Sequence, residues 1–322
     1  MWADYRNTPG SGDVYLRRSV DGGRSWLPTE VALETDPAVA STAPVVAASG
    51  ASVFVAWRGF SSGNSRVYCS ASPDRGASWT APVPVDSGDM AFAPKIASSG
   101  LEAVLTWEDR RGGIGDSRVY ARRVTVAWPN LILANEARLD PNDTEFSEAP
   151  EIAAAGSKIY VTWGENMQAL VMRSPDAGTT WMDRTNVGAG LFDLLPQSAA
   201  SGSYAYATWY EAGSRDIFFT SSANQGVTWS PLQRLDSSPG PTSLYPDIGC
   251  NGARVHVAWS DSRNTPGDIY VRRSNDAGAT WVPEQVLDSP ALSPTGESYG
   301  AQVSVYGSTV GVCWEERFRR SA

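Results

Sequence analysis

Acidic side chains recur at one fixed distance from a tryptophan along this chain of 322 residues. Two positions after each of these tryptophans stands a carboxylate, and the set is Asp4, Asp109, Glu165, Glu211, Asp261 and Glu316. In "WADYR", "WEDRR" and "WSDSR" an arginine follows two positions later, and these arginines are Arg6, Arg111 and Arg263. A carboxylate and a guanidinium this close in sequence can pair with each other or bind a polar ligand. Recurrence in nearly every copy favours pairing that pins a loop, because an active site needs different residues from different copies.

Aromatic side chains stand upstream of these acids and differ from copy to copy: Phe92, Phe146, Phe192, Tyr245 and Tyr299. An aromatic ring offers an apolar plane to a sugar ring, while nearby carboxylates and guanidinium groups can bind hydroxyl and carboxyl groups. The combination of Tyr245, Asp261 and Arg263 is therefore the predicted ligand-binding set. The alternative is that the aromatic rings only cap the ends of inner strands.

An eight-residue turn of the form Ser-x-Asp/Asn-x-Gly-x-Ser/Thr-Trp occurs five times, as "SVDGGRSW", "SPDRGASW", "SPDAGTTW", "SANQGVTW" and "SNDAGATW". Its glycine can adopt a positive φ, and its short polar side chains can bond to nearby backbone N–H groups. We therefore expect a structural role for the acid or amide of each turn: Asp21, Asp74, Asp176, Asn224 and Asp276. A sixth, degenerate copy is "RRVTVAWPN", around Trp128.

Short segments of alternating apolar residues recur in step with these turns, about fifty residues apart. They include "VFVAW", "AVLTW", "IYVTW", "AYATW", "VHVAW" and "VGVCW". Alternation with a period of two is typical of strands, and each period holds four of them. We name the four strands A, B, C and D in chain order. The segments just quoted are strands B, and the eight-residue turn lies between C and D. Four antiparallel strands per period predict a β-propeller, here an all-β protein of six blades.

The two ends of the chain match in phase. The start, "MWADYRNTPGSGDVYLRRS", resembles "AWSDSRNTPGDIYVRRS", and the end, "STVGVCW", reads as a strand B. We therefore expect residues 1–322 to form one domain whose closing blade combines about 1–36 with 297–322.

Composition narrows the classes of function. The formal charge of −9 argues against nucleic-acid binding, which needs a basic surface, and no apolar run is long enough for a membrane span. Cys69, Cys250 and Cys313 have no metal-binding spacing and are expected to be buried free thiols. We expect no metal, no cofactor and a monomer. The single histidine, His256, replaces Phe or Tyr of other copies, so it is predicted to pack within a blade.

The repeated turn resembles the Asp-box, or bacterial neuraminidase repeat, of sialidase-like propellers. The resemblance covers essentially the whole chain. It implies that the Asp-box hairpins lie at the outer edge of the blades, away from the functional face, and that the B–C and D–A loops form that face. It also implies an extracellular or periplasmic location, although no signal peptide is visible.

Sialidases need three arginines around a carboxylate, a tyrosine nucleophile with a glutamate partner, and an aspartate acid/base. The resemblance therefore implies Arg58, Arg111 and Arg263 as the arginines, Tyr245 or Tyr299 as nucleophile, Glu165 or Glu211 as its partner, and Asp109 or Asp261 as the acid. The family's Arg-Ile-Pro motif is absent, which favours a propeller that binds carbohydrate or another ligand without a complete sialidase site. An exo-sialidase-like glycoside hydrolase and a protein-interaction scaffold are the alternatives.

Overall fold

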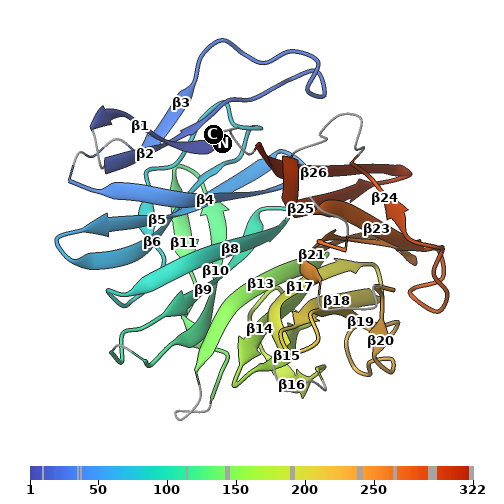
Figure 1. The fold of residues 1–322 in the computed structure, drawn as a ribbon. Helices are drawn as coiled ribbons and strands as arrows, with labels where there is room; N and C mark the ends of the chain where they lie inside the picture. The colour runs from blue at the N-terminus through green and yellow to red at the C-terminus, as the bar shows by residue number, and fades with distance from the viewer. Residues whose placement is uncertain are drawn as a thin grey trace. The chain divides into compact units, whose positions relative to one another are not determined.

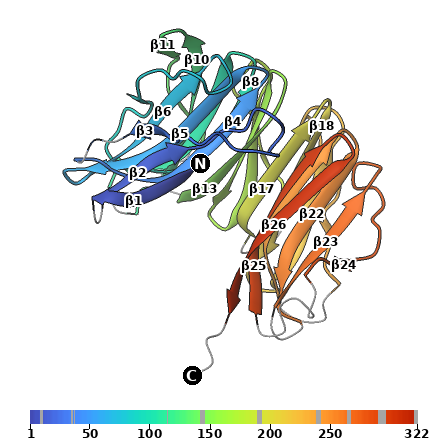
Figure 2. The same ribbon diagram turned by 90° about the horizontal axis from the view of Figure 1, so that it is seen from above.

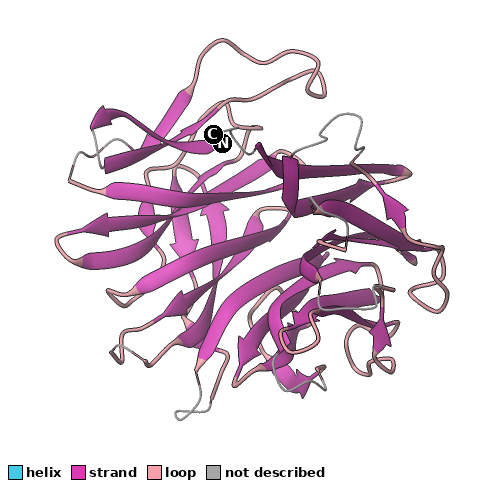
Figure 3. Cartoon of the chain, viewed as in Figure 1, coloured by secondary structure: helices cyan, strands magenta, loops and turns pink. Residues whose placement is uncertain are grey.

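The computed structural model describes residues 1–322 except 9–10, 35, 37, 114, 142–145, 189–192, 238–241, 264–266, 289–295 and 319–322. The described residues form strands, turns and loops only (Figure 3). None of them belongs to a helix with the length and apolar character needed to cross a bilayer. The all-β class predicted from the alternating segments is therefore confirmed.

The chain divides into two compact units, residues 1–150 with 174–181, and residues 151–173 with 182–322. Figure 1 follows the strands along the chain.

The early strands make three sheets. The first contains β1 (Trp2–Thr8), β2 (Ser11–Leu16) and β3 (Val31–Glu34). The second contains β4 (Ala40–Ser49), β5 (Ser52–Ser61), β6 (Asn64–Ser72) and β7 (Val83–Pro84). The third contains β8 (Ala91–Ser99), β9 (Glu102–Asp109), β10 (Arg118–Ala127), β11 (Asn130–Leu133) and β12 (Ala137–Arg138).

The later strands make three sheets of four and one of two. The first of these contains β13 (Ser147–Ala155), β14 (Lys158–Glu165), β15 (Gln168–Ser174) and β16 (Met182–Asn186). The next contains β17 (Asp193–Ser201), β18 (Tyr204–Glu211), β19 (Asp216–Ser222) and β20 (Gln233–Arg234). It is followed by β21 (Ser243–Asn251), β22 (Arg254–Asp261), β23 (Asp268–Ser274) and β24 (Gln285–Val286). The last contains β25 (Gly296–Tyr306) and β26 (Thr309–Phe318).

The tryptophan near the end of each predicted strand B belongs to the hydrophobic core. Trp57, Trp107, Trp163, Trp209 and Trp259 are completely buried. Large buried rings pack successive sheets together within each unit. In the second unit, for example, residues of β22 and β23 pack against Ala301, Val303 and Val312 of β25 and β26. Figure 2 shows β25 and β26 beside the sheet that contains β22 and β23.

The first two strands of the chain pair in the same register as later strands of the repeat. Trp2 pairs with Tyr15 in the register that joins Trp57 to Tyr68 and Trp259 to Tyr270, so β1 takes the strand-B place beside β2. The six-bladed arrangement and its closing blade stay a prediction.

Two local expectations need correction or refinement. All three cysteines are free; Cys69 is buried and Cys250 half-buried, but Cys313 is exposed on β26, whose described partner strand is β25. The degenerate turn around Trp128 is replaced by a hairpin in which β11 continues antiparallel to β10.

Candidate functional site

The five eight-residue turns of the form Ser-x-Asp/Asn-x-Gly-x-Ser/Thr-Trp have closely similar hydrogen-bond patterns. In the last copy, the Ser274 hydroxyl oxygen accepts a bond from the Gly278 N–H at 2.9 Å. The Asp276 carboxylate accepts bonds from the Thr280 N–H at 2.8 Å and the Thr280 hydroxyl at 2.5 Å. The same contacts recur in the turns that contain Asp21, Asp74 and Asp176. In the turn that contains Asn224, the amide accepts from the Thr228 N–H but donates to the Thr228 hydroxyl. The four carboxylates and the Asn224 amide are therefore hydrogen-bonded inside their own turns.

The acid and the arginine of each Trp-x-Asp-x-Arg motif also bind each other. In the second unit, Arg263 binds Asp261 at 2.5 Å and Glu284 at 2.7 Å, and its guanidinium carbon lies 4.1 Å from the centre of the Tyr270 ring. In the first unit, Arg111 binds Asp109 at 2.6 Å and Glu136 at 2.7 Å. Each arginine therefore already has two carboxylate partners.

The most exposed copy repeats this arrangement with Arg6, which binds Asp4 and Glu30. Sequence reasoning missed the second carboxylate of each group: Glu30, Glu136 and Glu284. A signal was present, because a glutamate stands shortly before the predicted strand D in "TEVALE", "NEARLD" and "PEQVLD".

Burial and pairing act in opposite directions on Asp261. Burial raises the pKa of Asp261, but hydrogen bonds from the Arg263 side chain, the Arg263 N–H and the Ser243 hydroxyl outweigh burial. The pKa of Asp261 therefore lies below its ordinary value, and the carboxylate stays ionised at neutral pH. An ionised acid that is paired in this way is a poor proton donor to a glycosidic oxygen.

The two glutamates predicted as partners of a nucleophile are engaged locally. Glu165 is buried, accepts a hydrogen bond from the Trp163 indole N–H at 2.9 Å and pairs with Arg184. Glu211 accepts bonds from the backbone N–H groups of Gly213 at 2.9 Å and Ser214 at 2.6 Å. Burial raises the pKa of Glu211, but these donors outweigh burial and hold the pKa below its ordinary value.

Arg58 differs from the other predicted arginines. Its Nε donates to the Ser65 hydroxyl at 2.6 Å, and that hydroxyl donates to the Ala91 carbonyl at 2.6 Å. Its guanidinium carbon lies 4.4 Å from the centre of the Phe92 ring. Burial lowers the pKa of Arg58, and no described carboxylate lies within ion-pair distance of it. Arg58 is therefore a partly buried cation that has no carboxylate partner in the part of the chain that the structure describes.

A second arginine extends this surface. Arg110 lies 5.3 Å from the Phe92 ring centre and 5.7 Å from that of Phe146, which is 37% exposed. Arg110 also pairs with Glu108 at 2.6 Å. We call Arg58, Phe92, Arg110 and Phe146 the cation–aromatic surface.

A further acid lies near this surface. Burial raises the pKa of Glu148, and the neighbouring Glu108 raises it further, while Arg110 acts in the opposite direction. A carboxyl group with a raised pKa holds its proton more firmly than an ordinary glutamate does. Glu148 was not predicted from the sequence; it lies in β13, two residues after Phe146.

The predicted tyrosines occupy different surroundings. Tyr245 is 46% exposed and meets the edge of Tyr210, with ring centres 6.0 Å apart. Tyr299 donates a hydrogen bond to Glu315 at 2.6 Å and accepts one from Arg317 Nε at 2.8 Å. The partner of Tyr299 is therefore Glu315, not Glu165 or Glu211. Phe192 lies outside the described residues.

A β-bulge interrupts the first strand of five of the sheets, close to where the strand begins. Strands β4, β8, β17, β21 and β25 each shift register near a residue of positive φ: Ala43, Ala93, Leu195, Tyr245 and Gly300. Bulges of this kind turn neighbouring side chains away from the regular pleat. Phe92 and Tyr299 immediately precede the bulge residue, whereas Tyr245 is the bulge residue itself.

The predicted residues are thus only partly brought together. Asp261 with Arg263, and Asp109 with Arg111, are direct pairs, while Tyr245 has its described ring contact with Tyr210. Arg58 and Arg111 belong to the first unit and Arg263 to the second. Among the residues the structure describes, no group of three or more His, Cys, Asp or Glu side chains is arranged to hold a metal ion.

Comparison with known proteins shows which fold this chain resembles. No protein-family model matches the sequence. The sialidase of Micromonospora viridifaciens is 25% identical over 325 residues, covering 96% of this chain and 46% of that protein. The Hadza microbial sialidase Hz136 matches 78% of this chain and 57% of its own, with a TM-score of 0.51 and 15% identity. The NanB sialidase of Streptococcus pneumoniae matches 87% of this chain and 65% of its own, with a TM-score of 0.53 and 12% identity.

The chain has a sialidase-like fold. It spans about half the length of the curated relative that it matches.

Proposed function

We propose that this sialidase-like chain binds acidic carbohydrate through the cation–aromatic surface and lacks a complete sialidase site. The observation that carries the proposal is Arg58, a partly buried guanidinium with no described carboxylate partner. A carboxylate on a sugar would supply the missing counter-charge, and the exposed ring of Phe146 would offer a face to the sugar.

The remaining arginines explain why binding is favoured over hydrolysis. Arg111 and Arg263 each hold two carboxylates of the chain itself, so a substrate carboxylate would have to displace them. The second candidate is the surface predicted around Tyr245, Asp261 and Arg263. The exposed ring of Tyr245 can still stack on a sugar, although Arg263 is already paired with Asp261.

Calorimetry with N-acetylneuraminic acid, glucuronic acid and glucose tests the proposal. We expect both acids to bind and glucose to bind more weakly. Arg58→Gln removes a charged donor and should weaken acid binding about tenfold or more. Arg75→Gln is the matched control, because it removes the same charge from an exposed turn position where another copy carries Gln225.

Variants at the two surfaces separate the sites. Phe146→Ala should weaken binding if the cation–aromatic surface is used, whereas Tyr245→Ala should do so if the second candidate is used. Equal affinity in Arg58→Gln, Phe146→Ala and wild type would reject the cation–aromatic surface.

One observation favours exo-sialidase activity as a second candidate function. A tyrosine hydrogen-bonded to a glutamate can act as a nucleophile, since the carboxylate can accept the phenolic proton. Tyr299 and Glu315 form such a pair, although the bond to Glu315 raises the pKa of Tyr299 while Arg317 acts against that rise. Release of fluorophore from a fluorogenic sialoside by wild type, but not by Tyr299→Phe, would establish this activity. No release by wild type would exclude it.

The finer architecture belongs to the same proposal. We infer six blades with Asp-box turns, a closing blade from about residues 1–36 and 297–322, and an extracellular or periplasmic location. The match in phase between the ends of the chain and the sialidase-like fold support this arrangement.

A further inference from the structure

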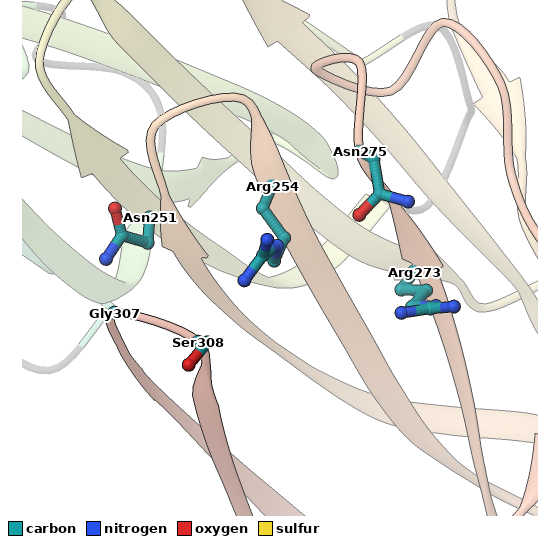
Figure 4. Close-up of a pocket in the computed structure, with 6 residues that line it drawn as sticks. All are labelled: Asn251, Arg254, Arg273, Asn275, Gly307 and Ser308. Atoms are coloured by element: carbon teal, nitrogen blue, oxygen red, sulfur yellow. The ribbon is translucent and has the colours of Figure 1, made fainter.

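A polar cavity of about 660 Å³ lies in the second unit, at the opposite end of the β21–β24 sheet from Asp261. Its lining is Asn251, Arg254, Arg273, Asn275, Gly307 and Ser308. These residues come from the turn between β21 and β22, the end of β23 with its Asp-box turn, and the turn between β25 and β26. Figure 4 shows Arg254 between Asn251 and Ser308 on one side and Arg273 and Asn275 on the other.

Two cations share this cavity without a described counter-charge. Neither Arg254 nor Arg273 has a carboxylate within ion-pair distance among the residues the structure describes. The adjacent Arg272, by contrast, donates to the carbonyls of Val282 at 3.0 Å and Leu235 at 2.7 Å. In a chain of net charge −9, two unmatched guanidinium groups that line one cavity form a local positive site.

His256 supplies a second, independent observation. It faces Arg273 across the β22–β23 ladder and lies two residues from Arg254, so the three side chains share one face of the sheet. His256 is 7% exposed, and its buried Nδ1 has no hydrogen-bond partner among the described residues. Burial lowers the pKa of His256, and the charges of Arg273 and Arg254 lower it further.

We propose that this cavity binds a tetrahedral oxyanion, sulfate or phosphate, either free or as an ester on a sugar. Arg254 and Arg273 bind its oxygens as charged donors, while the Asn251 and Asn275 amides and the Ser308 hydroxyl supply neutral donors. The site is separate from the cation–aromatic surface, so either assignment can fail without the other.

The only histidine of the chain is the reporter for the test. The NMR signal of His256 in the full chain is titrated with pH, alone and with sodium sulfate, sodium phosphate, N-acetylglucosamine 6-sulfate or N-acetylglucosamine. A bound anion offsets the two guanidinium charges, so sulfate, phosphate and the sulfated sugar should raise the pKa of His256 by about 0.5 or more. The unmodified sugar should leave it unchanged. Tighter binding of the sulfated sugar than of free sulfate would assign the ester as the preferred ligand, and the reverse would assign the free ion.

Single substitutions locate the site. Arg254→Gln and Arg273→Gln should each weaken the anion response at least about tenfold, while Arg75→Gln should not. The His256 signal without anion shows whether each variant is folded. An anion response that is equal in wild type and both cavity variants, or no response in wild type, would overturn the proposal.

Discussion

At the scale of single residues, the same carboxylate serves different purposes according to its neighbours. Asp261 and Asp109 are buried and bind arginine, whereas Asp276 is exposed and binds the hydroxyl and N–H of its own turn. The spacing Trp-x-Asp-x-Arg predicted the pairing of Asp261 with Arg263. It did not predict Glu284, since the third member comes from another part of the sheet and sequence spacing carries no register between strands.

The carboxylates of the eight-residue turns should contribute stability that depends on pH. Hydrogen bonds from Ser274 and Thr280 lower the pKa of Asp276 from 3.8 to about 2. A lowered pKa in the folded state means that this contribution is complete above pH 3.8 and is lost as the pH falls towards 2. The thermal midpoint of wild type should therefore exceed that of Asp276→Ala at pH 5, and the difference should shrink between pH 4 and pH 2.

Asp276→Asn is the matched control for this effect. Asn224 already fills the equivalent place, where it accepts from the Thr228 N–H at 2.9 Å and donates to the Thr228 hydroxyl at 2.9 Å. Asp276→Asn should keep most of the stability of wild type at pH 5. A difference between wild type and Asp276→Ala that is constant from pH 5 to pH 2 would contradict the assignment.

At the scale of elements, the eight-residue turn that contains Asp276 joins β23 to β24 and also packs its glycine against a neighbouring sheet. Gly278 has φ +88°, and a Cβ at this position would lie 2.3 Å from an atom of the Phe219 ring. Phe219 cannot move away easily, because it is buried and Trp281 packs edge-on against it with ring centres 4.9 Å apart. The turn therefore needs glycine for its backbone conformation and for space.

Two alanine substitutions separate these requirements. Gly50 also has a positive φ, of +63°, but a Cβ there meets no atom within 4 Å. Gly50→Ala should cost about 1–2 kcal/mol of unfolding free energy from backbone strain alone. Gly278→Ala should cost about 1–3 kcal/mol more, because the overlap with Phe219 is added. Urea denaturation measures both, and equal losses would show that Phe219 makes room.

The elements were the most predictable part of the structure. Alternation in segments such as "VHVAW" predicted strands, and Ser-x-Asp-x-Gly predicted tight turns, because both are governed by local chemistry. The bulges at Ala93 and Tyr245 were not predicted, although Ala-Pro or Tyr-Pro marks the place. Their effect on side-chain direction depends on the partner strand. The contact of Arg58 with Phe92 could not be predicted for the same reason, since it joins β5 to the start of β8.

At the scale of the whole molecule, the repeat gives two segments, one at each end of the chain, that could both take the strand-B place beside β2. Trp2 and Trp314 occupy equivalent repeat positions, and Trp2 already pairs with Tyr15. Beyond Tyr15, residues 16–19 have no described partner in β1, while β3 pairs with Leu16 on the other side. If the proposed closing blade forms, the register of Val255 with Ser274 in the β22–β23 pair places residues 310–313 of β26 opposite residues 16–19. The two ends would then share strand B, with one part from each.

Comparing the full chain with a variant that lacks residues 303–322 tests this closure. We expect the amides of residues 16–19 to exchange slowly with solvent in wild type and at least about tenfold faster in the deletion, because they lose backbone partners. The deletion also exposes Ala258 and Val271, which pack against Val303 and Val312, so a lower thermal midpoint alone would not identify the cause. The double substitution Val303→Ser with Val312→Ser is the control, because it weakens that packing while it keeps the strand. Fast exchange at residues 16–19 in wild type, or slow exchange that survives the deletion, would reject a blade closed by both ends.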